Sequence, residues 1–156
     1  MKADKGLLIK CIVLPLLVGG VAAFITGGGM ELFQRINKPP LSPPGWLFPI
    51  VWTILYTLMG IASYLVITSD APTEEITSAI KTYIYQLIVN FLWPTFFFNF
   101  EWYFFSLIWI IVLWILILIM FRQFYKINKK AGYLIIPYLL WVTFAAYLNL
   151  GIWWLN

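Results

Sequence analysis

The strongest constraint on this chain is a series of long apolar stretches that contain almost no charged side chains. The clearest stretch lies between Lys81 and Glu101, where no residue is charged. A helix of about 20 apolar residues spans the hydrocarbon core of a bilayer, and lipid forces the backbone to satisfy its own hydrogen bonds. The sequence therefore predicts one all-α domain over residues 1–156, an integral membrane bundle of five transmembrane helices. The expected spans cover about residues 7–27, 46–69, 77–100, 102–125 and 132–154.

The composition excludes several other classes of protein. The chain is 63% hydrophobic and 10% charged, whereas soluble domains are about 25% charged. A net charge of +4 is too small and too dispersed to indicate a nucleic-acid partner, and it fits membrane orientation instead. The chain has no histidine, six acidic residues near the ends of the runs, and a single cysteine, Cys11. These counts argue against a metal site, an internal disulfide and conventional acid–base catalysis.

The first apolar run, Cys11–Thr26, follows a basic amino-terminal segment and allows two interpretations. A cleaved signal peptide also has a basic start, a short apolar region and small residues near its end. The run continues through Phe24 and Ile25 without a good cleavage triplet, which favours a membrane span. Small residues spaced four apart permit close helix packing, either within the bundle or between protomers. They are Gly19, Ala23 and Gly27.

The longest segment between spans covers Gly27–Gly45. Apolar and polar residues alternate with helical spacing over Met30–Asn37, which predicts a short amphipathic helix on the membrane surface. The prolines that follow forbid regular helix and stiffen the chain. Such a loop is either a plain connector or a lid over a ligand site. The candidate lid residues are Phe33, Lys38, Pro43 and Pro44.

The third apolar run carries a polar and aromatic face. Pro94 lacks an N–H group, so the carbonyl oxygen of Asn90 loses its helical partner. Unsatisfied polar groups are costly in lipid, so this face should turn inward. The amide of Asn90 then either orients a ligand or holds neighbouring helices together. Four residues at helical spacing share the face: Gln86, Asn90, Trp93 and Phe97.

Two further runs have comparable faces, whereas the fourth run does not. The second run aligns Trp52, Tyr56, Met59 and Ser63, and the fifth aligns Tyr138, Trp141, Ala145 and Asn149. The fourth run is almost entirely Ile, Leu, Phe and Trp, so we expect it to face lipid and assign it no function. The remaining tryptophans are expected to serve packing or the interfacial belt. They are Trp102, Trp109, Trp114, Trp153 and Trp154.

The basic residues are distributed unevenly between the two expected membrane sides. Five spans place the chain ends on opposite sides, and loops rich in Lys and Arg stay in the cytoplasm. The amino-terminal side holds Lys2, Lys5, Lys10, Lys81, Arg122, Lys126, Lys129 and Lys130, and the other side holds only Arg35 and Lys38. The amino terminus is therefore predicted to be cytoplasmic, with the long loop and the carboxyl terminus outside.

Four segments, in order and spread over the chain, resemble the translocator protein / tryptophan-rich sensory protein family, also called TspO/MBR or the peripheral-type benzodiazepine receptor family. They are Lys38-Pro39-x-x-x-Pro43-Pro44-x-Trp46, Pro49-x-Val51-Trp52-Thr53-x-Leu55-Tyr56, Gln86-Leu87-x-x-Asn90-x-x-Trp93-Pro94-x-Phe96-Phe97 and Pro137-Tyr138-Leu139-x-Trp141-x-x-Phe144-Ala145-x-x-Leu148-Asn149. The resemblance implies a five-helix homodimer in a membrane, here most simply a bacterial cell membrane, with a ligand pocket under the first loop.

The resemblance also implies binding of porphyrins such as protoporphyrin IX and of isoquinoline carboxamide or benzodiazepine-type drugs, with no permanently bound cofactor. Bacterial relatives imply light-dependent porphyrin degradation, for which Trp52 and Trp141 are the candidate catalytic residues. The family resemblance and the inward faces together give the candidate ligand-binding residues. They are Trp46, Trp52, Tyr56, Gln86, Asn90, Trp93, Phe97, Tyr138, Trp141, Ala145 and Asn149. A porphyrin transporter and a sensory partner without turnover are alternatives.

The sequence departs from the family pattern at three places. Leu32-Phe33 stands where the family commonly has Trp-Tyr, so a hydroxyl of the loop is missing, and Pro39-x-Leu41 replaces Pro-x-Trp. The carboxyl-terminal stretch Leu148–Trp154 lacks the Tyr and Arg of the cholesterol motif of animal members. That motif is weak even when it is present, so we predict no cholesterol binding through it.

Overall fold

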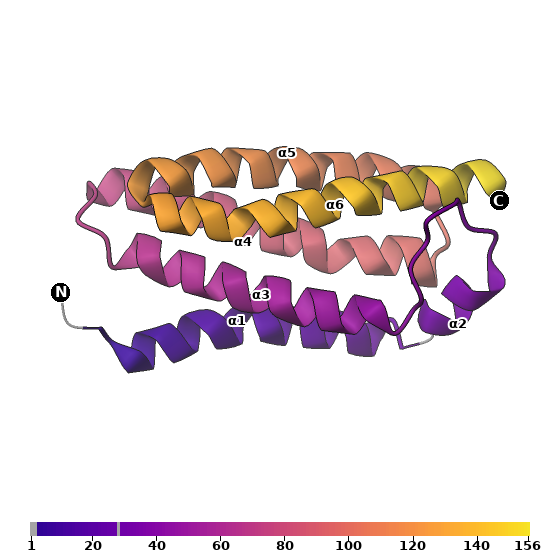
Figure 1. Cartoon of the computed structure of the whole chain (residues 1–156), viewed down its shortest axis with the longest axis horizontal. Coiled ribbons are helices and arrows are strands. Elements are labelled where there is room, and N and C mark those ends of the chain that lie inside the picture. The colour runs from indigo at the N-terminus through magenta and orange to yellow at the C-terminus, as the bar shows by residue number, and fades with distance from the viewer. Residues whose placement is uncertain (1–2, 28) are drawn as a thin grey trace.

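The computed structural model describes residues 3–27 and 29–156, and over these residues the chain is helical. The elements are α1 (Lys5–Ile25), α2 (Gly29–Arg35), α3 (Leu47–Ile67), α4 (Thr73–Pro94), the π-helical turn η1 (Thr95–Asn99), α5 (Tyr103–Ile127) and α6 (Lys129–Leu155). Five long helices lie side by side, and α2 sits at the end of the bundle that holds the carboxyl terminus (Figure 1). The all-α prediction is confirmed, as is the short helix after the first run. Lys2 of the predicted charge asymmetry and Gly28 of the loop lie outside the described residues.

The apolar character of the long helices defines an integral membrane protein. Among the helices that the structure describes, four are long and apolar enough to span a bilayer: α1, α3, α5 and α6. Helix α4 falls short of this standard because polar residues interrupt its apolar run, among them Lys81, Gln86 and Asn90. Helix length and hydropathy therefore establish four candidate spans rather than the five expected.

Side chains cap two helices at the amino-terminal end of the bundle. The Asp4 carboxylate accepts a hydrogen bond from the Leu7 amide at the start of α1. The Asn128 side-chain oxygen accepts from the amides of Lys130 and Ala131 and begins α6 directly after α5. Such caps satisfy amides that lack a helical partner. They fix the reversal between α5 and α6, which pack along each other.

Glycines set how closely α1 approaches α3. A Cβ atom on Gly60 of α3 would lie 2.5 Å from the Cα atom of Ile12 and 2.6 Å from the carbonyl oxygen of Cys11. A Cβ atom on Gly19 of α1 would lie 2.2 Å from the Tyr56 ring. Within the small-residue stripe, Gly19 therefore makes a contact inside the bundle. This close packing brings the Tyr56 side chain beneath α1.

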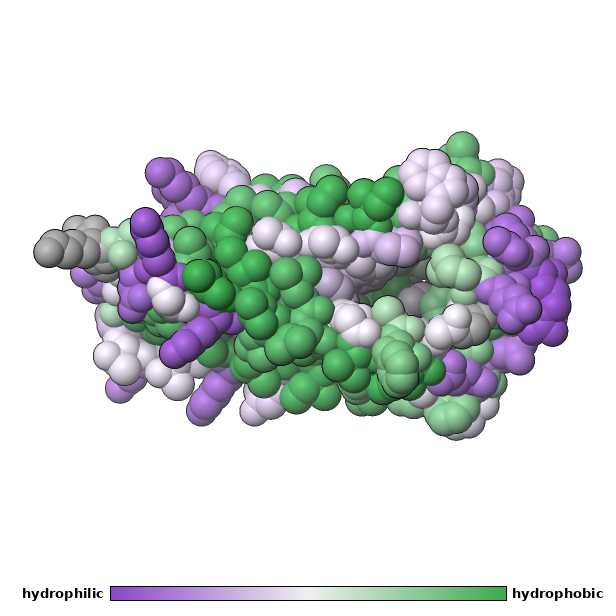
Figure 2. Space-filling model, turned by 90° about the horizontal axis from the view of Figure 1, so that it is seen from below, coloured by the Kyte–Doolittle hydropathy of each residue, from purple (hydrophilic) through white to green (hydrophobic). Residues whose placement is uncertain are grey.

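Side chains fill the half of the bundle nearest the amino terminus. Met59, Ile117, Met120, Phe124 and Ile135 are fully buried there. Polar surfaces lie at the two ends of the molecule, with an apolar band between them (Figure 2). The same view shows a hollow on the face where α1 lies, in the half that carries the loop. The loop half therefore contains the space available to a ligand.

The loop between α2 and α3 is fastened to the carboxyl-terminal end of α6. The Tyr147 hydroxyl donates to the Pro40 carbonyl oxygen at 2.7 Å. A Cβ atom on Gly151 would lie 2.5 Å from the Pro39 ring, so the proline packs directly on the helix backbone. The Asn156 side chain donates to the Asn37 carbonyl oxygen at 2.8 Å. These contacts hold the loop over the open end of the bundle.

Candidate functional site: a ligand cavity beneath the loop

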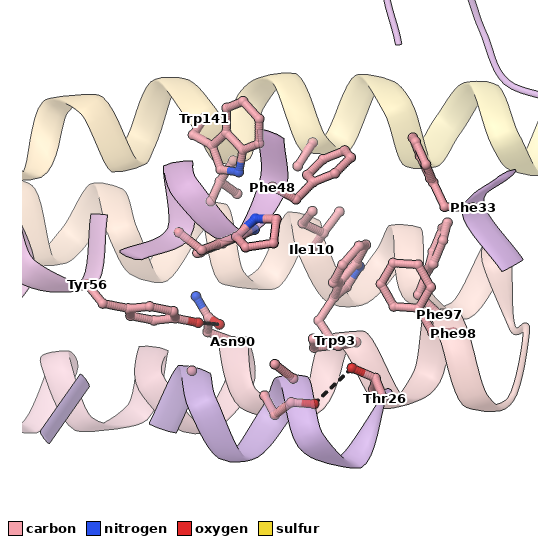
Figure 3. Close-up of a pocket in the computed structure, with 18 of the residues that line it drawn as sticks. Thr26, Phe33, Phe48, Tyr56, Asn90, Trp93, Phe97, Phe98, Ile110 and Trp141 are labelled. Carbon is pink, nitrogen blue, oxygen red and sulfur yellow. Dashed lines mark hydrogen bonds between the residues drawn. The ribbon is translucent and has the colours of Figure 1, made fainter. Parts of the chain in front are cut away.

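A cavity of about 330 Å³ lies in the loop half of the bundle. Side chains from every helix and from η1 line it, and most of them are apolar (Figure 3). Nine residues singled out from the sequence line it: Phe33, Trp52, Tyr56, Asn90, Trp93, Phe97, Trp141, Ala145 and Asn149. The inward faces predicted for three separate runs therefore meet in one place.

A hydrogen-bonded network forms the floor of the cavity. The Tyr56 hydroxyl donates to the Asn90 side-chain oxygen at 2.8 Å, as Figure 3 shows. The Asn90 side-chain nitrogen donates to the Tyr138 hydroxyl oxygen at 2.7 Å. The Tyr138 hydroxyl in turn donates to the Gln86 side-chain oxygen at 2.7 Å. Asn90 thus joins α3, α4 and α6, which is one of the two roles that the sequence left open, and it also lines the cavity.

Aromatic rings close the cavity at the loop end. The rings of Phe33 and Phe48 meet edge to face at 5.1 Å, and those of Phe48 and Trp141 at 5.8 Å. Phe97 and Phe98 lie beside Phe33 at the same end (Figure 3). Because Phe33 belongs to α2, the first loop contributes directly to the roof. The predicted lid function of this loop is consistent with that position.

Asn149 holds one aromatic wall of the cavity in place. Its side-chain oxygen accepts a hydrogen bond from the Trp93 indole nitrogen at 3.1 Å. Its side-chain nitrogen donates to the Tyr103 carbonyl oxygen at 2.9 Å. The Trp93 ring stacks on the Phe97 ring with centroids 5.0 Å apart. Asn149 therefore uses its amide to orient Trp93 as a flat apolar surface.

The Trp141 indole offers a free hydrogen-bond donor. Its Nε1 atom is buried and has no hydrogen-bond partner within the described part of the chain. A buried donor without an acceptor costs about 1–3 kcal/mol. Figure 3 shows the indole nitrogen on the side of the ring that faces the cavity. A ligand that presents a carbonyl or carboxylate oxygen here would satisfy it.

Six candidate residues lie outside the cavity lining. Trp46 is 68% exposed at the start of α3, a position typical of the interfacial aromatic belt. Gln86 and Tyr138 are buried behind Asn90 and complete its network. The Lys38 ammonium group donates to the Phe33 carbonyl oxygen at 2.7 Å, so it supports the roof from outside. The other two residues are Pro43 and Pro44 of the loop.

Sequence reasoning missed two parts of the lining. The fourth run was expected to face lipid only, yet Ile110 and Leu113 of α5 line the cavity. Helix α5 is apolar over most of its length, and its one small polar residue, the buried Ser106, lies on the same face as Ile110 and Leu113 and could have identified the inward face. Helix α1 contributes small side chains that leave space rather than fill it. They are Gly19, Gly20, Ala22, Ala23 and Thr26.

The fold and the cavity define an integral membrane protein with a mostly apolar and aromatic cavity between its helices. Comparison with known proteins identifies the family. The chain matches the TspO/MBR family over residues 11–155, and it therefore belongs to that family.

The similar proteins come from distant organisms. The chain is 37% identical over 150 residues to the tryptophan-rich protein TspO of Chlorobaculum tepidum, an alignment that covers 96% of this chain and 95% of the relative. It is 36% identical over 119 residues to the tryptophan-rich sensory protein of Cereibacter sphaeroides, covering 76% and 73%. It is 30% identical over 131 residues to the translocator protein of Homo sapiens, covering 83% and 78%.

Proposed function

We propose that this protein binds flat aromatic amphiphiles of the tetrapyrrole class, such as protoporphyrin IX, in the cavity beneath its first loop. The observation that carries the proposal is the cavity itself. Its walls present the rings of Trp52, Trp93 and Trp141, and its polar groups are few. Aromatic faces suit a planar ring system, and a small number of polar groups suffices to orient it.

The size of the cavity bears on which ligands it accepts. Ligand pockets commonly measure about 300–1,000 Å³, and this cavity of about 330 Å³ is at the small end of that range. Isoquinoline carboxamide or benzodiazepine-type molecules have two or three fused rings and a carbonyl oxygen, which matches the free donor of Trp141. A tetrapyrrole is larger, so we expect the ring pair Phe33 and Phe48 to move apart when it binds.

We further propose that the bound porphyrin is degraded in light. The macrocycle absorbs the photon and dioxygen is the oxidant, so the chain supplies position and nearby oxidisable groups. Trp52 and Trp141 are the proposed electron donors because both indoles line the cavity, from the neighbouring helices α3 and α6. The centroid of the Trp52 ring lies 5.4 Å from that of the Tyr56 ring. Each cleavage breaks one methine bridge of the macrocycle and adds both atoms of one dioxygen to the product, so the electron that an indole lends returns to it and no outside reductant is consumed.

We propose five spans: the four candidate helices and, third in chain order, α4 together with η1. The two elements run continuously from Thr73 to Asn99, and α4 packs against α5 and α1 in the same bundle. The uneven distribution of Lys and Arg supports a cytoplasmic amino terminus in a bacterial cell membrane. The family resemblance supports a homodimer, which the mass of the protein in lipid nanodiscs tests.

A transporter is the competing function, and the packing of the bundle argues against it. A pathway across the membrane would have to continue from the cavity floor toward the amino-terminal end. That half is filled by fully buried side chains, among them Met120 and Phe124. Opening it would expose well-packed core residues, at a cost of several kcal/mol. Uptake of porphyrin into sealed vesicles above a binding-only control would favour the transporter instead.

The test is a spectroscopic titration with protoporphyrin IX in nanodiscs, first in the dark and then under illumination. We expect saturable binding in the dark and loss of the porphyrin absorbance band in light, with uptake of dioxygen. Trp52→Phe should keep its affinity but lose the bleaching, because a phenyl ring still stacks but is harder to oxidise. Trp141→Phe should also lose bleaching, and its affinity should fall by about tenfold because a hydrogen-bond donor is gone.

Trp154→Phe is the matched control because Trp154 is 77% exposed at the end of α6 and lies outside the cavity lining. It should bind and bleach porphyrin like the parent protein. Equal bleaching by the parent, both cavity variants and free porphyrin would rule out the degradation proposal. Binding without saturation in the parent would rule out the binding proposal.

A further inference from the structure

We infer that ligand reaches the cavity sideways from the bilayer, through a portal between α1 and α3, and not from water beneath the loop. This inference rests on the proposed function, and it names the source of the ligand: a planar amphiphile already dissolved in the membrane. It follows from which lining residues are exposed, from how the loop is fastened, and from the depth of the opening.

Most of the exposed cavity lining lies on two facing helix segments, and the exception is Met30 of α2, which is 37% exposed. Gly20 and Ala23 of α1 and Pro49 and Thr53 of α3 line the cavity and are also exposed at the surface. No atom lies within 4 Å of the position that a Cβ atom on Gly20 would occupy. The wall is therefore open here because α1 carries no side chain large enough to close it. Figure 2 shows a hollow on this face of the molecule.

The route from water beneath the loop is more obstructed than the portal between α1 and α3. The loop is fastened to α6 by the Tyr147 hydrogen bond to the Pro40 carbonyl oxygen and by the packing of Pro39 on Gly151. Its α2 segment buries Leu32 and Phe33, each only 5% exposed. Access beneath the loop would break these contacts before a ligand gained any in return.

The depth of the portal suits an amphiphile. Gly20 and Ala23 lie in the last turns of α1, and Pro49 and Thr53 in the first turns of α3. At 1.5 Å per residue, the four residues lie about 3–9 Å inside the helix ends. This is the boundary between lipid headgroups and acyl chains, where apolar faces of amphiphiles settle. A planar ring with a carboxylate edge would rest there beside the opening, its ring level with the cavity.

The experiment measures binding rates of protoporphyrin IX to the full chain in phosphatidylcholine nanodiscs, followed by quenching of tryptophan fluorescence. Gly20→Leu and Ala23→Leu each place a branched side chain in the portal. We expect the association and dissociation rate constants to fall together by about tenfold, with Kd changed less than about threefold, because an obstructed route slows both directions. Thermal unfolding of each variant checks that the bundle is intact.

Two controls separate the routes. Val21→Leu places the same leucine side chain on α1 at a position that is 48% exposed and lies outside the lining, so the rates should not change. Tyr147→Phe releases the loop from the Pro40 carbonyl oxygen and should leave the rates unchanged if access is lateral. Parental rates in both portal variants, or faster association in Tyr147→Phe, would overturn the inference.

Failure of the portal is distinguishable from failure of the binding proposal. A parent protein that binds porphyrin saturably, at rates insensitive to both portal substitutions, removes the lateral route alone. A parent protein without saturable binding removes both proposals together.

Discussion

Replacing Asn90 with leucine should destabilise the ligand-free protein, because its amide joins three helices. Leucine has a similar size and leaves little empty space, so the hydrogen bonds are the main loss. The substitution removes the acceptor of the Tyr56 hydroxyl and the donor to the Tyr138 hydroxyl. Tyr138 retains its bond to Gln86, whereas Tyr56, only 7% exposed, is left without its acceptor.

The expected loss can be estimated from these two bonds. A side-chain hydrogen bond between membrane helices is worth about 0.6 kcal/mol on average, which applies to the bond from Asn90 to Tyr138. Leaving the buried Tyr56 hydroxyl unpaired costs about 1–3 kcal/mol. Together they predict a loss of about 2–4 kcal/mol in the free energy of unfolding. Asn99→Leu is the matched control because its bond to the Ile25 carbonyl oxygen is exposed and water can replace it.

The assay is reversible unfolding in mixed micelles, with a double-mutant cycle between Asn90→Leu and Tyr138→Phe. The two substitutions share one hydrogen bond, so their effects should be non-additive by about 0.5–1 kcal/mol. Asn99→Leu should change stability by less than about 0.5 kcal/mol. Unchanged stability of the ligand-free Asn90→Leu protein, or strict additivity in the cycle, would refute the role of Asn90 as a joint between helices.

Further predictions concern packing, the loop and topology. Gly60→Ala should lower stability by about 1–3 kcal/mol, because its Cβ atom would meet the α1 backbone at 2.5 Å; Gly20→Ala, with open space around it, should raise the unfolding midpoint slightly, because alanine favours a helix over glycine. Lys38→Met should speed hydrogen exchange in α2, because the Lys38 ammonium group no longer holds the carbonyl oxygens at the end of that helix; unchanged exchange would contradict this role. Cysteine at Leu41, 84% exposed, should be labelled from outside intact cells in a Cys11-free background, whereas cysteine at Lys129 should not, and the reverse result would invert the topology.

The sequence predicted the site best where polar residues interrupt apolar runs. Asn90, Trp93 and Phe97 were placed on one face by helical spacing, and all three line the cavity. A polar side chain in a membrane span must turn inward, so it reports its own orientation. The same rule placed Asn149, whose amide bonds Trp93.

The sequence was least informative about the site where neighbouring side chains are all apolar or all small. Ile110 has the same residue type as its lipid-facing neighbours on α5, and only its spacing of four residues from the buried Ser106 marks its face. Gly20 and Ala23 contribute by leaving space, which a residue pattern does not reveal. Trp46 matched the family motif, yet it is largely exposed outside the cavity. The hydropathy of α4 is lowered by polar residues such as Gln86 and Asn90, which turn inward and bond a neighbouring helix, so composition alone understates how well it suits a span.

The most direct test of the account is to fill the cavity from within. Ala145 of α6 lines the cavity, so Ala145→Trp would place an indole where the ligand is proposed to bind. Leu140→Trp, at a position 65% exposed on the same helix, is the control. In a dark titration with protoporphyrin IX in nanodiscs, we predict that Ala145→Trp remains folded and loses saturable binding, while Leu140→Trp binds like the parent. Parental affinity in a folded Ala145→Trp protein would show that the porphyrin binds elsewhere and would contradict the account.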